Sequence, residues 1–241
     1  MKSQNPFYRT IIHPADLVSF RINELESDLL ILAEKDLSQE ATVALKQQRK
    51  YLTDYITNHP DFYYSFSPVP VEDNSPQVVK MMAEAAWLTN TGPMAAVAGA
   101  LAQMVGRLLA LQSPRIIVEN GGDIYLQCDR PAVIAIYAGQ SPLSLKIGIR
   151  IPVASTGLGI ATSSGTVGHS YSFGKADAVT VVCGSAALAD AAATAIGNLV
   201  TPSENWEWIE SELKHFPFVE GVVIIAGKKM LVWGKIEIVS L

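Results

Sequence analysis

Residues 157–198 constrain the fold more than any other stretch, because a small-residue loop, an apolar strand and an alanine-rich helix follow one another there. Within the helix, Asp190 and Thr194 are four residues apart. Residues at i and i+4 share a helix face, so these two oxygen-bearing side chains point the same way. The small residues around them let other backbone, or a ligand, come close. The stretch therefore indicates one half of a functional site.

A second short stretch, Asn120-Gly121-Gly122-Asp123, follows an apolar run at residues 116–118, with Glu119 between them. Asn-Gly is a strong signal for a tight β-hairpin, so a plain hairpin explains this stretch when it is taken alone. The alternative is that it forms the other half of the site. Both interpretations stay open at the level of the sequence.

The composition is that of a folded protein with a large core. The chain has 241 residues, of which 49% are hydrophobic and 17% charged. This excludes intrinsic disorder and suits one large domain over residues 1–241, or two intimately joined ones. The net charge of -5 gives no basic footprint for nucleic acid. Cys128 and Cys183 form no CxxC pair and lie in apolar, strand-like segments, so we expect them to be buried and reduced.

The sequence also favours a cytoplasmic protein. The first residues lack the apolar region of a signal peptide. The nearest approach to a membrane span, residues 93–111, contains Gln103 and Arg107 and predicts a buried helix instead. The apolar composition further suggests a homodimer.

Periodicity and turn residues predict an α+β protein with a mostly antiparallel sheet and helices in blocks. Helices are expected over residues 38–58, 76–88, 93–111, 186–200 and 204–216, with Ser38 and Ser75 as the N-caps of the first two. Strands are expected over residues 8–12, 17–22, 28–33, 115–118, 124–128, 133–137, 145–151 and 178–183. Residues 62–75 are expected to be an extended connector. The chain is expected to end in a hairpin of residues 222–226 and 231–239.

Three kinds of chemical group converge if the two stretches meet. Backbone N–H groups of the small-residue loop can form an anion-binding nest. Asp190 and Thr194, aided by Asp123 or Asp177, offer hard oxygen ligands that suit Mg²⁺ together with substrate phosphates. His169 can act as a general base or donate to a leaving phosphate. Together these groups describe phosphate-ester chemistry on a nucleotide-like ligand.

Each group also has a structural explanation. A single histidine in a loop often serves only as a hydrogen-bonding group, and Asp190 alone is compatible with a helix cap or a surface charge. The small first turns of the helix after Pro93 suit an anion at the helix N-terminus, or close packing against a sheet. The sequence contains no His/Cys zinc cluster, P-loop, GxGxxG or Gly-x-Ser-x-Gly motif.

Three motifs resemble, in order and spacing, the ApbE superfamily, whose best known members are Mg²⁺-dependent FAD:protein FMN transferases. They are Asn120-Gly121-Gly122-Asp123-Ile124, residues 160–165 (IATSSG) and residues 189–195 (ADAAATA). The chain is more similar still to a cytosolic, largely uncharacterised branch of that superfamily, through residues 91–99, 118–123, 162–170 and 174–178.

The resemblance implies an ApbE-like fold, a flavin dinucleotide pocket lined by the Gly121-Gly122 turn, and metal binding by Asp190 and Thr194. In the transferases, the metal and a histidine near the Thr-Ser-Gly segment help to move FMN from FAD to a protein Thr or Ser, with AMP leaving. His169 falls roughly where that histidine stands. The expected ligand-binding residues are Asn120, Gly121, Gly122, Asp123, Thr162, Ser163, Ser164, Gly165 and Thr166, with His169 and Asp177 as catalytic residues.

The chain departs from the family pattern at two places, which leaves two hypotheses for its function. No Asp-Pro-Arg-Thr-Gly segment follows His169, and Met94-Ala95-Ala96 replaces the usual Lys-Gly-Tyr at the start of the central helix. The first hypothesis is an enzyme that moves FMN from FAD to a protein Ser or Thr, or cleaves the FAD pyrophosphate, with Mg²⁺. The second is a non-catalytic flavin- or nucleotide-binding protein of a biosynthetic pathway. Retention of His169, Asp190 and Thr194 favours the first, and the missing segment favours the second.

Overall fold

The large sheet of the protein is antiparallel and has the strand order β1-β2-β3-β4-β7-β8-β9-β10. The computed structural model describes residues 16–165, 175–201 and 205–241. The strands of the large sheet are β1 (Val18–Glu24), β2 (Ser27–Ala33), β3 (Ile116–Asn120), β4 (Asp123–Cys128), β7 (Ala154–Ser163), β8 (Ala178–Cys183), β9 (Val219–Ala226) and β10 (Lys229–Gly234). A smaller antiparallel sheet is formed by β11 (Glu237–Ser240), β6 (Ile147–Ile151) and β5 (Ala132–Ala135).

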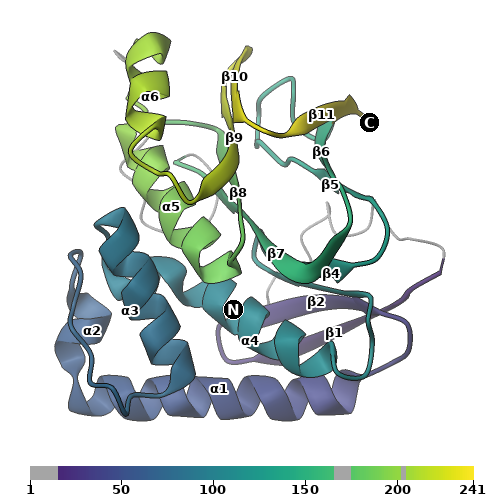
Figure 1. Cartoon of the computed structure of the whole chain (residues 1–241), viewed down its shortest axis with the longest axis vertical. Helices are drawn as coiled ribbons and strands as arrows, with labels where there is room; N and C mark the ends of the chain where they lie inside the picture. Colours follow the sequence, from purple (N-terminus) through teal and green to yellow (C-terminus); the bar gives the residue numbers. More distant parts are fainter. Residues whose placement is uncertain (1–15, 166–174, 202–204) are drawn as a thin grey trace.

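The helices gather beside the large sheet, as Figure 1 shows. They are α1 (Ser38–Asn58), α2 (Pro60–Tyr64), α3 (Gln77–Thr89), the 3₁₀ helix η2 (Pro93–Ala96), α4 (Val97–Leu109), α5 (Ala186–Leu199) and α6 (Trp206–Leu213). Helix α4 packs on β3 and β4, and α5 packs on β7 and β8 and against α3 and α4. The predicted α+β class, with mostly antiparallel sheets packed with helices, is confirmed.

Each face of the large sheet packs against its own apolar layer, because successive residues of a strand point to opposite faces. In β3, Ile116 and Val118 pack with the helices, while Ile117 packs in the layer shared with the small sheet. In β8, Val181 faces α5 and Val182 faces the small sheet. The large sheet is therefore the middle layer between the helices and the small sheet.

The strand register brings several connections to the same end of the large sheet. Leu29 pairs with Asn120, so the β1–β2 turn lies beside the β3–β4 turn. Ser163 at the end of β7 pairs with Val179, and Ala178 pairs with Ile225, so the β9–β10 turn lies at this end too. This end of the sheet carries most of the residues that the sequence indicates as functional.

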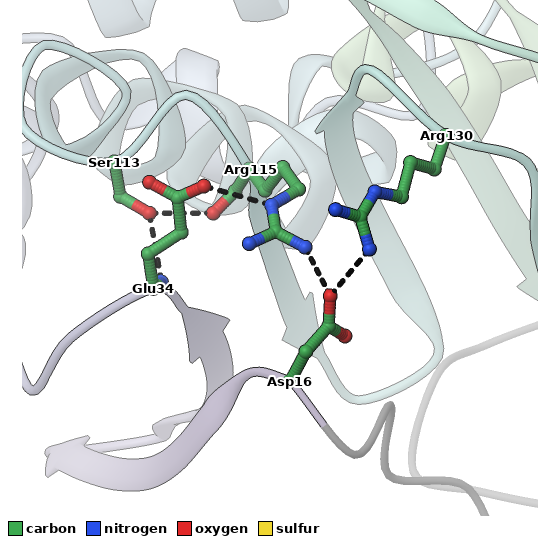
Figure 2. A network of polar contacts seen from close by, with 5 residues as sticks. All are labelled: Asp16, Glu34, Ser113, Arg115 and Arg130. Carbon is green, nitrogen blue, oxygen red and sulfur yellow. Dashed lines mark hydrogen bonds and ion pairs between the residues drawn. The ribbon is translucent and has the colours of Figure 1, made fainter.

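Arg115 joins three segments at the opposite end of β3 (Figure 2). Its Nε donates to Glu34 Oε1 at 2.7 Å, and its guanidinium also pairs with Asp16. Asp16 accepts in addition from Arg130 at 2.8 Å. Ser113 Oγ accepts the Glu34 N–H at 3.0 Å. The network ties the chain before β1 to the end of β2, the start of β3 and the connection after β4.

Two predicted helix caps are wrong. Ser38 is the first helical residue of α1, and its N–H donates to Asp36 Oδ1 at 2.9 Å. The residue that flanks α3 is Pro76, while Ser75 donates its hydroxyl to Glu72 Oε2 at 3.2 Å. Ser38 is not the cap because α1 already begins at it, and the Ser75 hydroxyl is used in its bond to Glu72.

Other boundaries also differ from the predictions. The segment expected as a final strand over residues 231–239 is two strands in two sheets, because the chain turns at Gly234, where φ is +85°. The helix expected over residues 93–111 begins as η2 before α4. The connector expected over residues 62–75 starts inside α2. The strand expected over residues 8–12 lies outside the described residues.

Within the described ranges, no single helix has both the length and the apolar character needed to cross a membrane. Helices Gln77–Thr89 and Pro93–Leu109 meet those two criteria only as a pair, and the pair is bent by 106°.

Candidate functional site

The β3–β4 connection is a two-residue turn. Asn120 pairs with Asp123 across it, and Gly121 and Gly122 adopt φ values of +68° and +113°. Side chains at both central positions would be strained, so the sequence needs glycine there. Glu119 Oε1 accepts the Gly122 N–H at 2.8 Å. The predicted hairpin is confirmed, and it stands at the end of the sheet described above.

Asp190 caps the N-terminus of a neighbouring helix. Its Oδ2 accepts the Gly99 N–H of α4 at 2.9 Å, and the Ala98 N–H also hydrogen-bonds this carboxyl. The first N–H groups of a helix have no partner within the helix, so a carboxylate from α5 completes the start of α4. Asn120 Nδ2 donates to the Ala98 carbonyl at 3.1 Å and ties the same turn to β3. The anion that the sequence suggested at this helix start is thus supplied by the protein itself.

Gln103 makes the reciprocal contact and was not predicted as a functional residue. Its Oε1 accepts the Ala186 N–H at 2.7 Å, the Ala187 N–H at 3.3 Å and the Ser185 hydroxyl at 2.9 Å. Each of the two helices therefore caps the start of the other. The sequence did offer one signal for this contact, an amide inside an apolar helix. A buried polar side chain needs hydrogen-bond partners, so such an amide indicates a contact with another element.

Two glycines let the start of α5 sit where it does. A Cβ on Gly99 would collide with the Ala186 carbonyl and come within 2.9 Å of Asp190 Cβ. A Cβ on Gly159 of β7 would collide with the backbone of Ser185 and Ala186. The small-residue surface predicted from the sequence is therefore used for close packing of α4, α5 and β7.

Three carboxyl groups interact at this point. Burial raises the pKa of Asp190 to about 7, although its hydrogen bonds from Gly99 and Ala98 act in the opposite sense. Burial also raises the pKa of Asp123 well above its usual range, and the neighbouring charges of Asp190 and Glu119 raise it further. The Thr162 N–H, which hydrogen-bonds Asp123, lowers it. The turn and the helix predicted as two halves of one site are therefore brought together, with three carboxyl groups between them.

The small-residue loop begins beside this cluster. Ala161 of β7 pairs with Asp123, and the next residue, Thr162, shares a hydroxyl hydrogen bond of 2.9 Å with Thr180. Ser163 is the last residue of β7, and Gly165 N–H donates to the Ala176 carbonyl at 3.0 Å. Ser164 lies between them and is partly exposed. Thr166 and His169 lie outside the described residues.

The remaining two predicted residues occupy different places. Thr194 is one turn after Asp190 on α5 and is partly exposed. Asp177 directly precedes β8, and its Oδ2 accepts the Gly227 N–H at 2.7 Å. The Asp177 side chain thus supports the β9–β10 turn.

No group of three or more His, Cys, Asp or Glu side chains is arranged to hold a metal ion in residues 16–165, 175–201 and 205–241. The residues predicted to bind metal, Asp190 and Thr194, and the neighbouring Asp123 carry oxygen donors only. Such a set fits Mg²⁺, which keeps several waters and is usually bound by one or two carboxylates plus substrate phosphates.

A family model described as AbpE bacteria matches residues 9–209. The chain belongs to this family. The resemblance expected from its motifs is thereby confirmed, and relatives support it. UPF0280 protein MJ1526 of Methanocaldococcus jannaschii is 40% identical over 213 residues, which cover 86% of each protein. A UPF0280 protein of Methanospirillum hungatei is 40% identical over 213 residues, which cover 88% of this chain and 85% of that protein.

Solved structures match the fold of this AbpE family member. The flavin transferase ApbE from Vibrio cholerae aligns with a TM-score of 0.55 at 14% identity, over 91% of this chain and 97% of that one. The flavinyl transferase ApbE from Pseudomonas stutzeri aligns with a TM-score of 0.56 at 15% identity, over 91% and 95%. At such identities the likeness establishes the ApbE-like fold.

Proposed function

We propose that this protein carries out Mg²⁺-dependent flavin chemistry, either FMN transfer from FAD to a protein Ser or Thr, or cleavage of the FAD pyrophosphate. The observation that carries the proposal is the meeting of Asp190, Asp123 and the Gly121-Gly122 turn at the start of α4. The flavin transferases named above share the fold, which supports the choice of flavin among nucleotide ligands.

Asp190 and Thr194 would hold the metal, with Asp123 beside them. The Gly99 N–H fixes one oxygen of Asp190, which orients the carboxylate before any ligand arrives. A bound Mg²⁺ would neutralise the developing negative charge of the pyrophosphate. It would also relieve the repulsion at Asp123, whose pKa is raised by burial and by the neighbouring charges of Asp190 and Glu119.

The ligand would lie along the end of the sheet. The glycines of the β3–β4 turn allow the dinucleotide to approach the backbone at Asn120–Asp123, and Ser163, Ser164 and Thr166 would bind phosphate oxygens, with Thr162 and Gly165 beside them. His169 or Asp177 would take the proton of the attacking hydroxyl. The new bond joins that oxygen to the phosphorus of FMN, and the bond to the bridging oxygen breaks, so AMP leaves. Water as the nucleophile gives free FMN.

A second candidate function is binding without turnover. The sequence lacks the Asp-Pro-Arg-Thr-Gly segment after His169, which favours a flavin- or nucleotide-binding protein of a biosynthetic pathway. The acceptor protein, the cytoplasmic location and the homodimer remain predictions, and light scattering tests the last of them.

Purified protein incubated with FAD and Mg²⁺, with AMP and FMN followed by chromatography, tests the proposal. We expect AMP release that EDTA abolishes and that Asp190→Ala and His169→Ala strongly reduce. FAD that stays bound through gel filtration without AMP release would support the binding function instead. Absence of both binding and release would reject flavin as the ligand.

A further inference from the structure

Gln103 is an almost fully buried amide in the apolar helix α4, with 1% of its surface exposed. Its Oε1 receives three hydrogen bonds from the start of α5, at Ser185, Ala186 and Ala187. Burying an amide is unfavourable unless it is hydrogen-bonded, so an apolar residue would fill this space at less cost if packing were the only requirement.

The contacts between the two helices come in two matched pairs. Gly99 and Gln103 are four residues apart on α4, and Ala186 and Asp190 are four residues apart on α5. Gly99 bonds Asp190, while Gln103 bonds Ala186. Because i and i+4 residues share a helix face, the two contacts together fix both the sliding and the rotation of α5 relative to α4.

The start of α5 has little else to hold its N–H groups. Ser185, its N-cap, accepts the Leu188 N–H at 3.4 Å, which is a long hydrogen bond. Gln103 is the acceptor for the two preceding N–H groups, at Ala186 and Ala187. The position of the first turn of α5 therefore depends on this amide.

We infer that Gln103 is a positioning residue of the proposed metal and flavin site, which acts by holding the first turn of α5 so that Asp190 and Thr194 face the ligand. This inference rests on the proposed function. Without the Gln103 oxygen, the start of α5 is free to shift away from α4. Asp190 then keeps its carboxylate but not its place beside Asp123.

The test compares Gln103→Leu, which removes the acceptor, with Gln103→Glu, which keeps an oxygen at the helix start. Val105→Ala, a fully buried position on the same helix, is the matched control for loss of stability. Binding of MgCl₂ to each protein is measured by calorimetry, and kcat and KM for FAD are measured separately. All variants are first compared by thermal unfolding.

We expect Gln103→Leu to weaken Mg²⁺ binding by about tenfold or more, as substitutions behind metal ligands do. Gln103→Glu should recover most of that affinity, because a carboxylate at a helix N-terminus is a good acceptor. Val105→Ala should lower the melting temperature and leave Mg²⁺ affinity nearly unchanged. Equal losses of Mg²⁺ affinity in Gln103→Leu and Val105→Ala would overturn the inference about Gln103 and leave the proposed function standing. A wild-type protein that binds neither Mg²⁺ nor FAD would overturn the proposed function, and the inference with it.

Discussion

At the scale of single residues, Asp190 has a structural contact and a proposed chemical task. Its Oδ2 accepts the Gly99 N–H at 2.9 Å. Asp190→Asn keeps an oxygen for that contact, whereas Asp190→Ala removes it. We predict that Ala lowers the free energy of unfolding by about 0.5–2 kcal/mol, in the range of lost helix caps, and that Asn lowers it by less. Chemical denaturation measures both values. A loss in Asn as large as that in Ala would argue against the capping contact.

The pKa of Asp190 gives a second prediction at this scale. Its folded-state pKa is raised from an ordinary value of 3.8 to about 7 by burial. Between these values the folded protein binds a proton that the unfolded chain has released, so the stability of metal-free protein falls as the pH rises from about 4 to about 7. Asp123, whose pKa is raised in the same direction, adds to this trend. Melting temperatures across this range in EDTA check it, and Asp190→Asn should flatten the slope. A slope of the opposite sign would contradict the raised pKa.

Individual residues were predictable where a local rule applied. The i, i+4 spacing predicted that Asp190 and Thr194 share one face of a helix. Asn120-Gly121 predicted the turn between β3 and β4. Gln103 was noted only as an interruption of an apolar helix, because its partners lie at residues 185–187 and no local pattern links them. Ser38 and Ser75 fit the cap pattern, but α1 already begins at Ser38, and the Ser75 hydroxyl donates to Glu72. Tertiary partners and nearby carboxylates decide such cases.

At the scale of elements, the crossing of α4 and α5 depends on Gly99. Gly99→Ala adds a methyl group that meets the Ala186 carbonyl and Asp190 Cβ. We predict a loss of about 1–3 kcal/mol in unfolding free energy, as for overpacked cores, together with reduced Mg²⁺ affinity. Gly184→Ala is the control, because a Cβ there meets nothing within 4 Å. Denaturant unfolding measures the loss of stability. A loss of unfolding free energy in Gly99→Ala no larger than that in Gly184→Ala would show that the crossing of α4 and α5 tolerates the added methyl group.

Elements with a strong periodic pattern were predicted well, and their ends less so. The strand over residues 178–183 matches β8, and the helix over residues 38–58 matches α1. The final strand was predicted as one piece because apolar residues recur from Leu231 to Val239, in alternation with Lys235 and Glu237 in the second half. The break at Gly234 arises because Lys235 N–H donates to the Glu220 carbonyl and β11 pairs with β6. Sequence patterns do not report such long-range pairing.

At the scale of the whole molecule, the Arg115 network connects distant segments (Figure 2). The Arg115 side chain beside Asp16 lowers the pKa of that carboxyl. Asp16→Asn should lower the melting temperature modestly at low salt and much less near about 1 M salt, because salt screens exposed charge pairs. Thermal unfolding at the two salt concentrations measures the difference. An equal effect at both would mean that the ion pairs contribute little.

The architecture as a whole was predictable as a class. Successive hairpins and blocks of helices indicated an α+β fold, and the motifs indicated the ApbE-like arrangement that the matched structures bear out. The middle position of the large sheet, between helices and a second sheet, was not predicted. Strands such as β3 and β8 are buried on both faces, so they lack the polar alternation that would report it.

Metal-dependent flavin chemistry at Asp190 is tested most directly by AMP release from FAD by wild-type protein and by Asp190→Asn, with and without Mg²⁺. The asparagine variant is chosen because it is expected to keep the cap of α4 and hence the fold. We expect Mg²⁺-dependent AMP release by the wild type and its near-complete loss in the variant, at similar melting temperatures. AMP release that persists in a folded Asp190→Asn protein, or that needs no metal, would contradict the proposed metal-dependent chemistry.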